Sequence, residues 1–297
     1  MSKHCLKSWI LATRPWSFPA SAMPILVTLA YLFWLGKDVD WSIGIWTLLN
    51  IVFFHASGNV WSDYFDYKKG VDNEHSVGAT SLTSGEFTPS EIKKLAYILL
   101  IISTLSGIAL VVCTGIPTLF FGVVGVILTL LYPWMKYNAL GDVDIFLTYS
   151  LLPILGTTYV ATGTLGIDAL WLAIPIGLIT VGILHSNNAR DIEHDKRAGI
   201  RTFAMIVGKK AAAYIYCAEV ILPFMWIAGG IIFGLFPSLS LLVLPALKLV
   251  LDNVKKVMRF PLEGEKMLWG VDEATAKIQL IFSLLLVVSL LVDKLFL

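Results

Sequence analysis

The sequence predicts an all-α polytopic membrane protein with nine transmembrane helices. Of its 297 residues, 57% are hydrophobic and 14% are charged, whereas about 25% of the residues in soluble domains are charged. The mean hydropathy is +0.78. The apolar residues gather into runs long enough to cross a bilayer, which takes roughly 20 residues as a helix. Because no stretch is left for a sheet or a soluble domain, we expect a single transmembrane domain over residues 1–297.

Short links containing Gly, Pro or Asp join most of these apolar runs. Longer connections occur only at 63–94, 190–210 and 252–274. The N-terminal segment lacks the uninterrupted apolar core and the small-residue cleavage site of a signal peptide, so we expect the first span to be retained. The predicted spans are residues 17–36, 42–62, 95–114, 116–135, 143–164, 168–189, 211–234, 236–251 and 275–293.

Basic residues are distributed unevenly between the two sides of this topology. With the N-terminus inside, all 22 Lys and Arg residues except Lys37 and Lys294 fall on the inner side. The positive-inside rule therefore places the N-terminus and the three long connections in the cytoplasm. We expect a multi-pass protein of the inner or plasma membrane, with the lipid bilayer as its surroundings. The net charge of +1 and the lack of a basic tract give no sign of nucleic-acid binding.

Polar residues at helical spacing follow two of the spans. After the second span, one face of a continuing helix would carry Asn59, Ser62, Asp63 and Asp66. After the sixth span, the same spacing relates Asn188, Asp191 and Asp195, and Asn187 lies four residues before Asp191. A single Asp beside a Lys at a helix end is usually a solvated cap. Two matching polar faces at one membrane depth indicate a functional site instead.

Carboxylates at the edge of the hydrocarbon are costly unless they are paired, hydrated or bound to a cation. Clustered Asp oxygens suit Mg²⁺, which proteins hold with one or two carboxylates, waters and substrate phosphates. Metal ions would allow these acidic clusters to accept a diphosphate. Nearby basic side chains can hold the remaining phosphate oxygens; they are Lys68, Lys69, Lys136, Arg190, Lys196 and Arg201.

Other chemically capable residues carry less information. The three cysteines are widely spaced, and we assign them no chemistry. His55 and His185 lie near the polar faces, but a lone His in an apolar helix is more often a hydrogen-bonded structural residue. Glu219 lies well inside an apolar run, where a role facing a cavity and a structural hydrogen bond are equally compatible with the sequence.

Four separated segments resemble the UbiA superfamily of intramembrane prenyltransferases. They are RPWSFPASAMP from Arg14, SDYFDYKKGVD from Ser62, KYNALGD from Lys136 and NNARDIEHDKRAGIRT from Asn187. Within the superfamily they resemble the 1,4-dihydroxy-2-naphthoate prenyltransferases of menaquinone synthesis and their animal vitamin K counterparts. The resemblance implies a helical bundle around a central cavity whose mouth is capped by the cytoplasmic loops.

The resemblance also implies roles for individual residues. Asp63, Asp66 and Asp72 match the first aspartate-rich motif and Asp191 with Asp195 the second, jointly holding Mg²⁺ on a prenyl diphosphate as the catalytic and metal-binding set. Lys136, Asn187, Asn188 and Arg190 match positions around the substrates. Together with the residues singled out above, the expected substrate-binding set is Arg14, Asn59, Ser62, Lys68, Lys69, Lys136, Asn187, Asn188, Arg190 and Arg201.

Two departures from the family pattern stand out. The family usually has Asn where this chain has Ser62, so Asn59, one turn earlier on the same face, is a candidate to supply the amide. The loop VGATSLTSGE lacks an Arg that many members have, which leaves one phosphate contact open.

The resemblance implies transfer of a polyprenyl group to 1,4-dihydroxy-2-naphthoate with loss of CO₂. Other aromatic acceptors, 4-hydroxybenzoate or homogentisate, are the alternatives within this class. A cation transporter that uses the same aspartates is the alternative from another class. Four spans separate the two motifs, so both face the same side of the membrane, which favours a one-sided site for a soluble diphosphate head. The prenyl chain length and the oligomeric state stay open.

Overall fold

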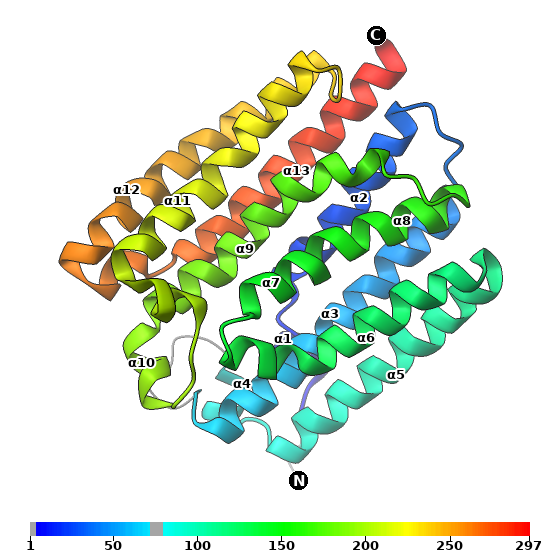
Figure 1. Cartoon of the computed structure of the whole chain (residues 1–297). Coiled ribbons are helices and arrows are strands. Elements are labelled where there is room, and N and C mark those ends of the chain that lie inside the picture. The colour runs from blue at the N-terminus through cyan, green and yellow to red at the C-terminus, as the bar shows by residue number, and fades with distance from the viewer. Residues whose placement is uncertain (1–3, 72–79) are drawn as a thin grey trace.

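The computed structural model describes residues 4–71 and 80–297, and this part of the chain folds into a bundle of long helices (Figure 1). Asp72, one of the predicted motif residues, lies outside the described residues. The helices are α1 (Leu6–Ala12), η1 (Pro15–Ser17), α2 (Pro19–Trp34), α3 (Trp41–Lys69), α4 (Thr80–Thr83), α5 (Pro89–Thr114), α6 (Ile116–Tyr137), α7 (Gly141–Phe146), η2 (Leu147–Leu151), α8 (Leu152–Thr162), η3 (Asp168–Leu172), α9 (Ala173–Arg190), α10 (Ile192–Arg197), α11 (Phe203–Ile232), η4 (Ser238–Ala246), α12 (Leu247–Glu263), η5 (Glu265–Leu268) and α13 (Val271–Phe296).

Eight helical segments of the described chain are long and apolar enough to cross a membrane. They correspond to eight of the nine predicted spans, with different ends. The remaining prediction, 236–251, falls on η4 and α12, which together run without a break from Ser238 to Glu263 and pack against α11 and α13. Charged residues follow from Lys248 onward, so this segment belongs to the bundle without meeting the criteria for a span. Figure 1 shows α12 alongside α11.

Local sequence signals explain where several helices begin and end. Asp40 caps α3 by accepting a hydrogen bond from the Ile43 backbone N–H at 3.0 Å, and Gly70 ends α3 in the left-handed conformation. Thr88 and Glu91 form a reciprocal capping box at the start of α5. Because α3 continues through Lys69, the first predicted polar face lies on one helix, as expected from its spacing.

The largest buried cluster joins α2, α9, α11 and α13, with fully buried side chains such as Tyr31, Ile176, Val220 and Phe282. Close helix contact depends on small residues in places. A Cβ at Gly177 would lie 2.5 Å from a ring carbon of Phe146, so α9 meets the end of α7 only through glycine. On the other side of the bundle, α5 and α6 lie at its edge in Figure 1 and expose large apolar side chains, as expected for surfaces in contact with lipid.

Candidate functional site

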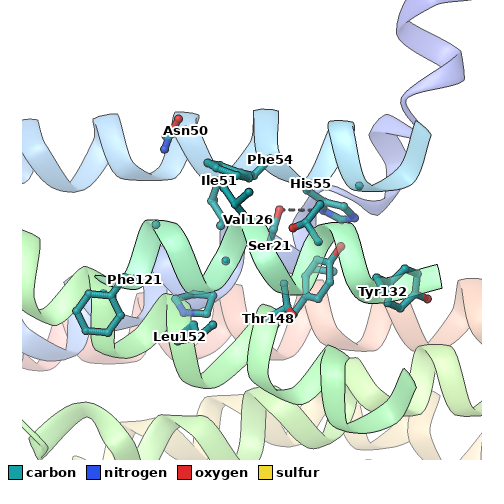
Figure 2. Close-up of a pocket in the computed structure, with 18 of the residues that line it drawn as sticks. Ser21, Asn50, Ile51, Phe54, His55, Phe121, Val126, Tyr132, Thr148 and Leu152 are labelled. Carbon is teal, nitrogen blue, oxygen red and sulfur yellow. Dashed lines mark hydrogen bonds between the residues drawn. The ribbon is translucent and has the colours of Figure 1, made fainter. Parts of the chain in front are cut away.

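A cavity of about 580 Å³ lies inside the bundle. Its lining residues on α3 extend from Thr47 to Asp66, which at 1.5 Å per residue corresponds to a length of about 28 Å. Figure 2 shows part of the lining, with Ile51, Phe121 and Leu152 along its apolar length. The charged lining residues are Arg14, Asp66, Lys136 and Asp144. The cavity is therefore a long, mostly apolar chamber with a few charged groups.

The first polar face is tied to the segment before α2. Asp63 forms an ion pair with Arg14, and its side chain is almost completely buried. Arg14 adopts a left-handed backbone conformation with φ 56°, which is uncommon for a residue with a Cβ and recurs at functional sites. Asn59 donates from Nδ2 to the Thr13 carbonyl at 3.0 Å and to Ser17 Oγ at 2.9 Å. These contacts place Arg14 over the polar face of α3.

The carboxylate of Asp66 contacts three side chains of the described chain. Lys136 Nζ lies 2.9 Å from Oδ2, and Ser62 Oγ donates to the same oxygen at 3.2 Å. The Tyr137 hydroxyl donates to Oδ1 at 2.7 Å. The end of α6 thus supplies a cation and a hydroxyl to the carboxylate on α3, and only the packing of these two helices creates that arrangement.

The second polar face is not carried by one straight helix, which corrects the sequence-based expectation. Helix α9 ends at Arg190, Asp191 leaves the helical conformation with φ −94° and ψ 10°, and α10 begins at Ile192. The buried Arg190 side chain lies at this interruption. It binds both carboxylate oxygens of Asp191 at 2.8 Å, reaches Asp272 at 2.8 Å and donates to Asn187 Oδ1 at 3.0 Å.

The two motifs act on one another electrostatically at Asp195. Burial raises the pKa of Asp195 to about 7, and the neighbouring carboxylates of Asp191 and Asp66 raise this pKa as well. The positive charges of Lys136 and Arg190 lower it without reversing the shift. No hydrogen bond or ion pair of the Asp195 side chain occurs within residues 4–71 and 80–297. A buried carboxyl group that lies near two other carboxylates is suited to a bound cation.

The predicted substrate-binding residues divide into two groups. Those that line the cavity are Arg14, Asn59, Ser62, Lys136 and Asn187. Those that do not are Lys68, Lys69, Asn188, Arg190 and Arg201. In the second group, Lys69 lies over the Tyr137 ring at 4.8 Å and Lys68 over the Tyr64 ring at 6.0 Å, both exposed. Arg201 is exposed and bonds through its backbone to the Tyr137 carbonyl, and Arg190 is committed to Asp191 and Asp272.

Several polar lining residues were not singled out from the sequence. Asp144 is buried, accepts a hydrogen bond from Thr148 at 3.2 Å through Oδ2, and has no hydrogen-bond partner at Oδ1 in the described residues. Its position inside the predicted span 143–164 was the available signal, because ionisable residues within spans are functional candidates. The π-helical turn η2, which carries Thr148 and Tyr149, widens the helix beside it, and such turns recur at functional sites.

His55 also faces the cavity, although the sequence favoured a purely structural role. Figure 2 shows its ring hydrogen-bonded to Ser21, with 2.9 Å between Nδ1 and Ser21 Oγ. The ring packs edge-on against Tyr149 with 4.8 Å between centroids. The structural hydrogen bond expected from the sequence is therefore present, and it is made at the cavity wall.

The helical bundle encloses an elongated apolar cavity, and carboxylates and cations meet at it. This combination is typical of membrane-embedded proteins that bind a molecule with a charged head and an apolar tail. The model of the UbiA prenyltransferase family matches residues 21–258. The chain belongs to the UbiA prenyltransferase family.

Relatives and solved structures agree with this assignment. The chain is 32% identical over 295 residues to the UbiA prenyltransferase domain-containing protein 1 homolog of Drosophila melanogaster, covering 96% of this chain and 79% of the relative. It is 29% identical over 296 residues to UbiA prenyltransferase domain-containing protein 1 of Danio rerio, covering 96% and 84%. A UbiA homolog from Archaeoglobus fulgidus, solved bound to DMAPP and Mg²⁺, shares the fold with a TM-score of 0.63 at 14% identity, covering 95% of this chain and 99% of that one. A digeranylgeranylglyceryl phosphate synthase structure has a TM-score of 0.61 at 20% identity, covering 96% and 98%.

Proposed function

We propose that this protein is a Mg²⁺-dependent prenyltransferase that moves a prenyl group from its diphosphate to an aromatic acceptor, 1,4-dihydroxy-2-naphthoate. The observation that carries the proposal is the cavity, which joins Asp66, Lys136 and Arg14 to a long apolar chamber. A prenyl diphosphate has the same division into a charged head and an apolar tail. The family membership supports the reaction class.

The residues present fit magnesium. The candidate ligands Asp63, Asp66, Asp191 and Asp195 offer hard carboxylate oxygens, and Asp195 is buried close to both Asp66 and Asp191. Magnesium, when bound, supplies positive charge to the diphosphate and to the oxygen that leaves with it. Solved UbiA homologs from Archaeoglobus fulgidus carry DMAPP or GPP together with Mg²⁺, which supports the same requirement here.

Arg14 and Lys136 have a second role in this proposal. Both now pair with motif carboxylates, Arg14 with Asp63 and Lys136 with Asp66. Asp63 and Asp66 would hold the cation, and Arg14 and Lys136, which contact these carboxylates, would lie close enough to bind the phosphate oxygens. Since nearly all basic residues lie at this end of the predicted topology, we infer that the diphosphate arrives from the cytoplasm, which the positive-inside rule supports.

The transfer itself breaks the carbon–oxygen bond between the prenyl group and the diphosphate, which leaves with the bonding electrons. Tyr132, Tyr149 and Phe54 line the cavity and can stabilise the allylic cation through their ring faces. The apolar walls keep water away from that cation. The naphthoate carbon that bears the carboxylate then forms the new carbon–carbon bond, and the carboxylate leaves as CO₂, so no ring proton has to be removed.

The choice of acceptor rests on the resemblance of NNARDIEHDKRAG and KYNALGD to the naphthoate branch. One feature of the cavity is compatible with it. Asp144 has a buried carboxylate oxygen without a partner in the described chain, and this oxygen can accept a hydrogen bond from an acceptor hydroxyl. Such a bond would orient an electron-rich ring beside the aromatic residues.

The test uses purified full-length protein with Mg²⁺, a labelled prenyl diphosphate and 1,4-dihydroxy-2-naphthoate labelled at its carboxyl carbon. Release of labelled CO₂ in proportion to the prenylated product is expected. Retention of the label in the product, or faster turnover of 4-hydroxybenzoate or homogentisate, would contradict the proposed acceptor. Absence of any prenyl transfer with all acceptors and several chain lengths would contradict the reaction class.

A further inference from the structure

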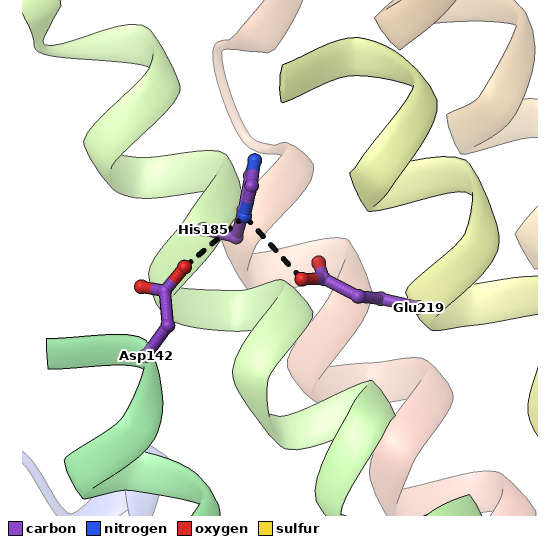
Figure 3. Close-up of side chains that lie close together, drawn as sticks. All are labelled: Asp142, His185 and Glu219. Atoms are coloured by element: carbon purple, nitrogen blue, oxygen red, sulfur yellow. Dashed lines mark ion pairs between the residues drawn. The ribbon is translucent and has the colours of Figure 1, made fainter. Parts of the chain in front are cut away.

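Three ionisable side chains from three different helices meet inside the bundle, outside the lining of the cavity. Figure 3 shows Asp142 of α7 and Glu219 of α11 on either side of His185 of α9. His185 Nδ1 lies 3.2 Å from Asp142 Oδ2 and 3.3 Å from Glu219 Oε1. The exposed fractions of the side chains are 0% for His185, 8% for Glu219 and 14% for Asp142. The three candidate ligand atoms lie within 4.8 Å of one another.

The polar atoms of this cluster are poorly satisfied. His185 Nδ1 is close to both carboxylates but makes a well-directed hydrogen bond to neither, and Nε2 has no partner in the described residues. The second oxygens of both carboxylates, Asp142 Oδ1 and Glu219 Oε2, are buried without a partner there as well. If both carboxylates are ionised, a protonated imidazole between them leaves one uncompensated negative charge in an apolar interior, which is unfavourable.

We propose that Asp142, His185 and Glu219 bind a divalent transition metal ion, Zn²⁺. Four-coordinate zinc with bonds of about 2.0–2.2 Å places adjacent ligand atoms roughly 3.4 Å apart, close to the two measured separations. A neutral imidazole and two carboxylates carry two negative charges, which the ion balances. The mixed nitrogen and oxygen ligands suit zinc, whereas the all-carboxylate motifs suit magnesium. A water molecule would take the fourth position.

The zinc site would fix elements that carry cavity residues. Asp142 follows Gly141, where a Cβ would lie 3.3 Å from the Cα of Lys136, so the start of α7 packs on the Lys136 backbone. His185 precedes the cavity residue Asn187 by two positions on α9. An ion that joins α7, α9 and α11 would therefore restrict the backbone positions of the cavity residues Lys136 and Asn187. Its ligands are positioning residues, and zinc binding does not depend on the identity of the acceptor.

The experiment uses the full-length chain, freed of any affinity tag and purified in detergent from cells grown with zinc. We expect about one zinc per chain, measured by inductively coupled plasma mass spectrometry. After chelation, added Co²⁺ should produce the visible absorption of a four-coordinate site with nitrogen and oxygen ligands. His185→Gln and Glu219→Gln should lose the stoichiometric zinc and the Co²⁺ absorption. Asp144→Asn and Asp191→Asn, which remove carboxylates outside the cluster, should keep both.

Thermal unfolding distinguishes a metal site from a hydrogen-bonded cluster, because chelation changes the Tm only if the cluster binds a metal. Chelation should lower the Tm of the wild type, added Zn²⁺ should restore it, and His185→Gln should respond to neither. If the wild type contains no stoichiometric metal and takes up no Co²⁺, the cluster is a hydrogen-bonded one and the proposal is wrong. If Co²⁺ uptake survives His185→Gln but is lost in Asp191→Asn, the ion occupies the aspartate motifs and the proposal is equally wrong. The proposed function is tested separately, by the Mg²⁺-dependent transfer assay, so its failure can be told apart from either of these results.

Discussion

Asp66→Asn removes one negative charge from the first motif and leaves the size of the side chain almost unchanged. The asparagine keeps the side-chain volume and an oxygen that can accept the hydrogen bond from the Tyr137 hydroxyl, which is 2.7 Å long in the wild type. Lys136 loses its ion-pair partner; in the wild type its Nζ lies 2.9 Å from the Asp66 carboxylate, and its side chain is 16% exposed. Removing one partner of a fully buried ion pair costs about 3–5 kcal/mol, and the partial exposure of Lys136 places the expected stability loss at the low end, about 3 kcal/mol. Loss of one charge-stabilising group should lower kcat by roughly 10²- to 10³-fold, or about 2.7–4 kcal/mol.

The assay is prenyl transfer at saturating Mg²⁺, with Tm measured on the same preparation. The double variant Asp66→Asn with Lys136→Met removes both partners of the ion pair, so it should regain most of the lost Tm but none of the lost kcat. Tyr137→Phe serves as the matched control, because it removes the hydrogen bond to Asp66, worth about 1.5–3 kcal/mol for a charged acceptor, and keeps the carboxylate charge. A folded Asp66→Asn protein with near-normal kcat would refute the assignment of this carboxylate to the metal.

Three further predictions concern the other polar residues. Asn59→Ala should lower kcat/KM roughly 30-fold, because it removes two hydrogen bonds of about 1 kcal/mol each. Ser62→Ala should cost less than about threefold. Equal, mild effects of the two substitutions would contradict the idea that Asn59 supplies the family amide. Arg190→Lys should lower Tm and raise the Mg²⁺ concentration needed for half-maximal activity, since a lysine cannot bind both oxygens of Asp191; unchanged values would show that this fork is dispensable. The pKa of Asp195 is raised to about 7, above the usual value near 3.9. Between these two pKa values the metal-free folded protein holds a proton at Asp195 that the unfolded chain has lost. The Tm of the metal-free protein should therefore fall as the pH rises from about 4 to about 7. Below pH 7 the metal must displace that proton, so the Mg²⁺ requirement should fall between pH 6 and pH 8, and a Mg²⁺ titration of wild type and Asp195→Asn should find the trend only in the wild type.

The sequence by itself determined the features that depend on neighbouring residues. The spans follow from the length of apolar runs, because every backbone group in lipid has to be bonded within the same segment. The polar face of α3 follows from helical spacing, since residues three and four apart share a face wherever the helix continues. The same argument did not predict the interruption at Asp191, between α9 and α10. At 236–251 the length of the apolar run did not show that η4 continues into α12, which carries charged residues from Lys248 onward.

Only the tertiary structure decided which distant residues meet. Arg14 reaches Asp63 because of an unusual backbone conformation ahead of α2, and Lys136 reaches Asp66 because α6 ends beside α3. Hydrophobic periodicity shows which face of a helix is buried. It does not show which helix covers that face, or how the two helices are placed along their axes. For this reason Glu219 and His185, each compatible with an isolated structural role in the sequence, could be recognised as one cluster only after the helices were packed.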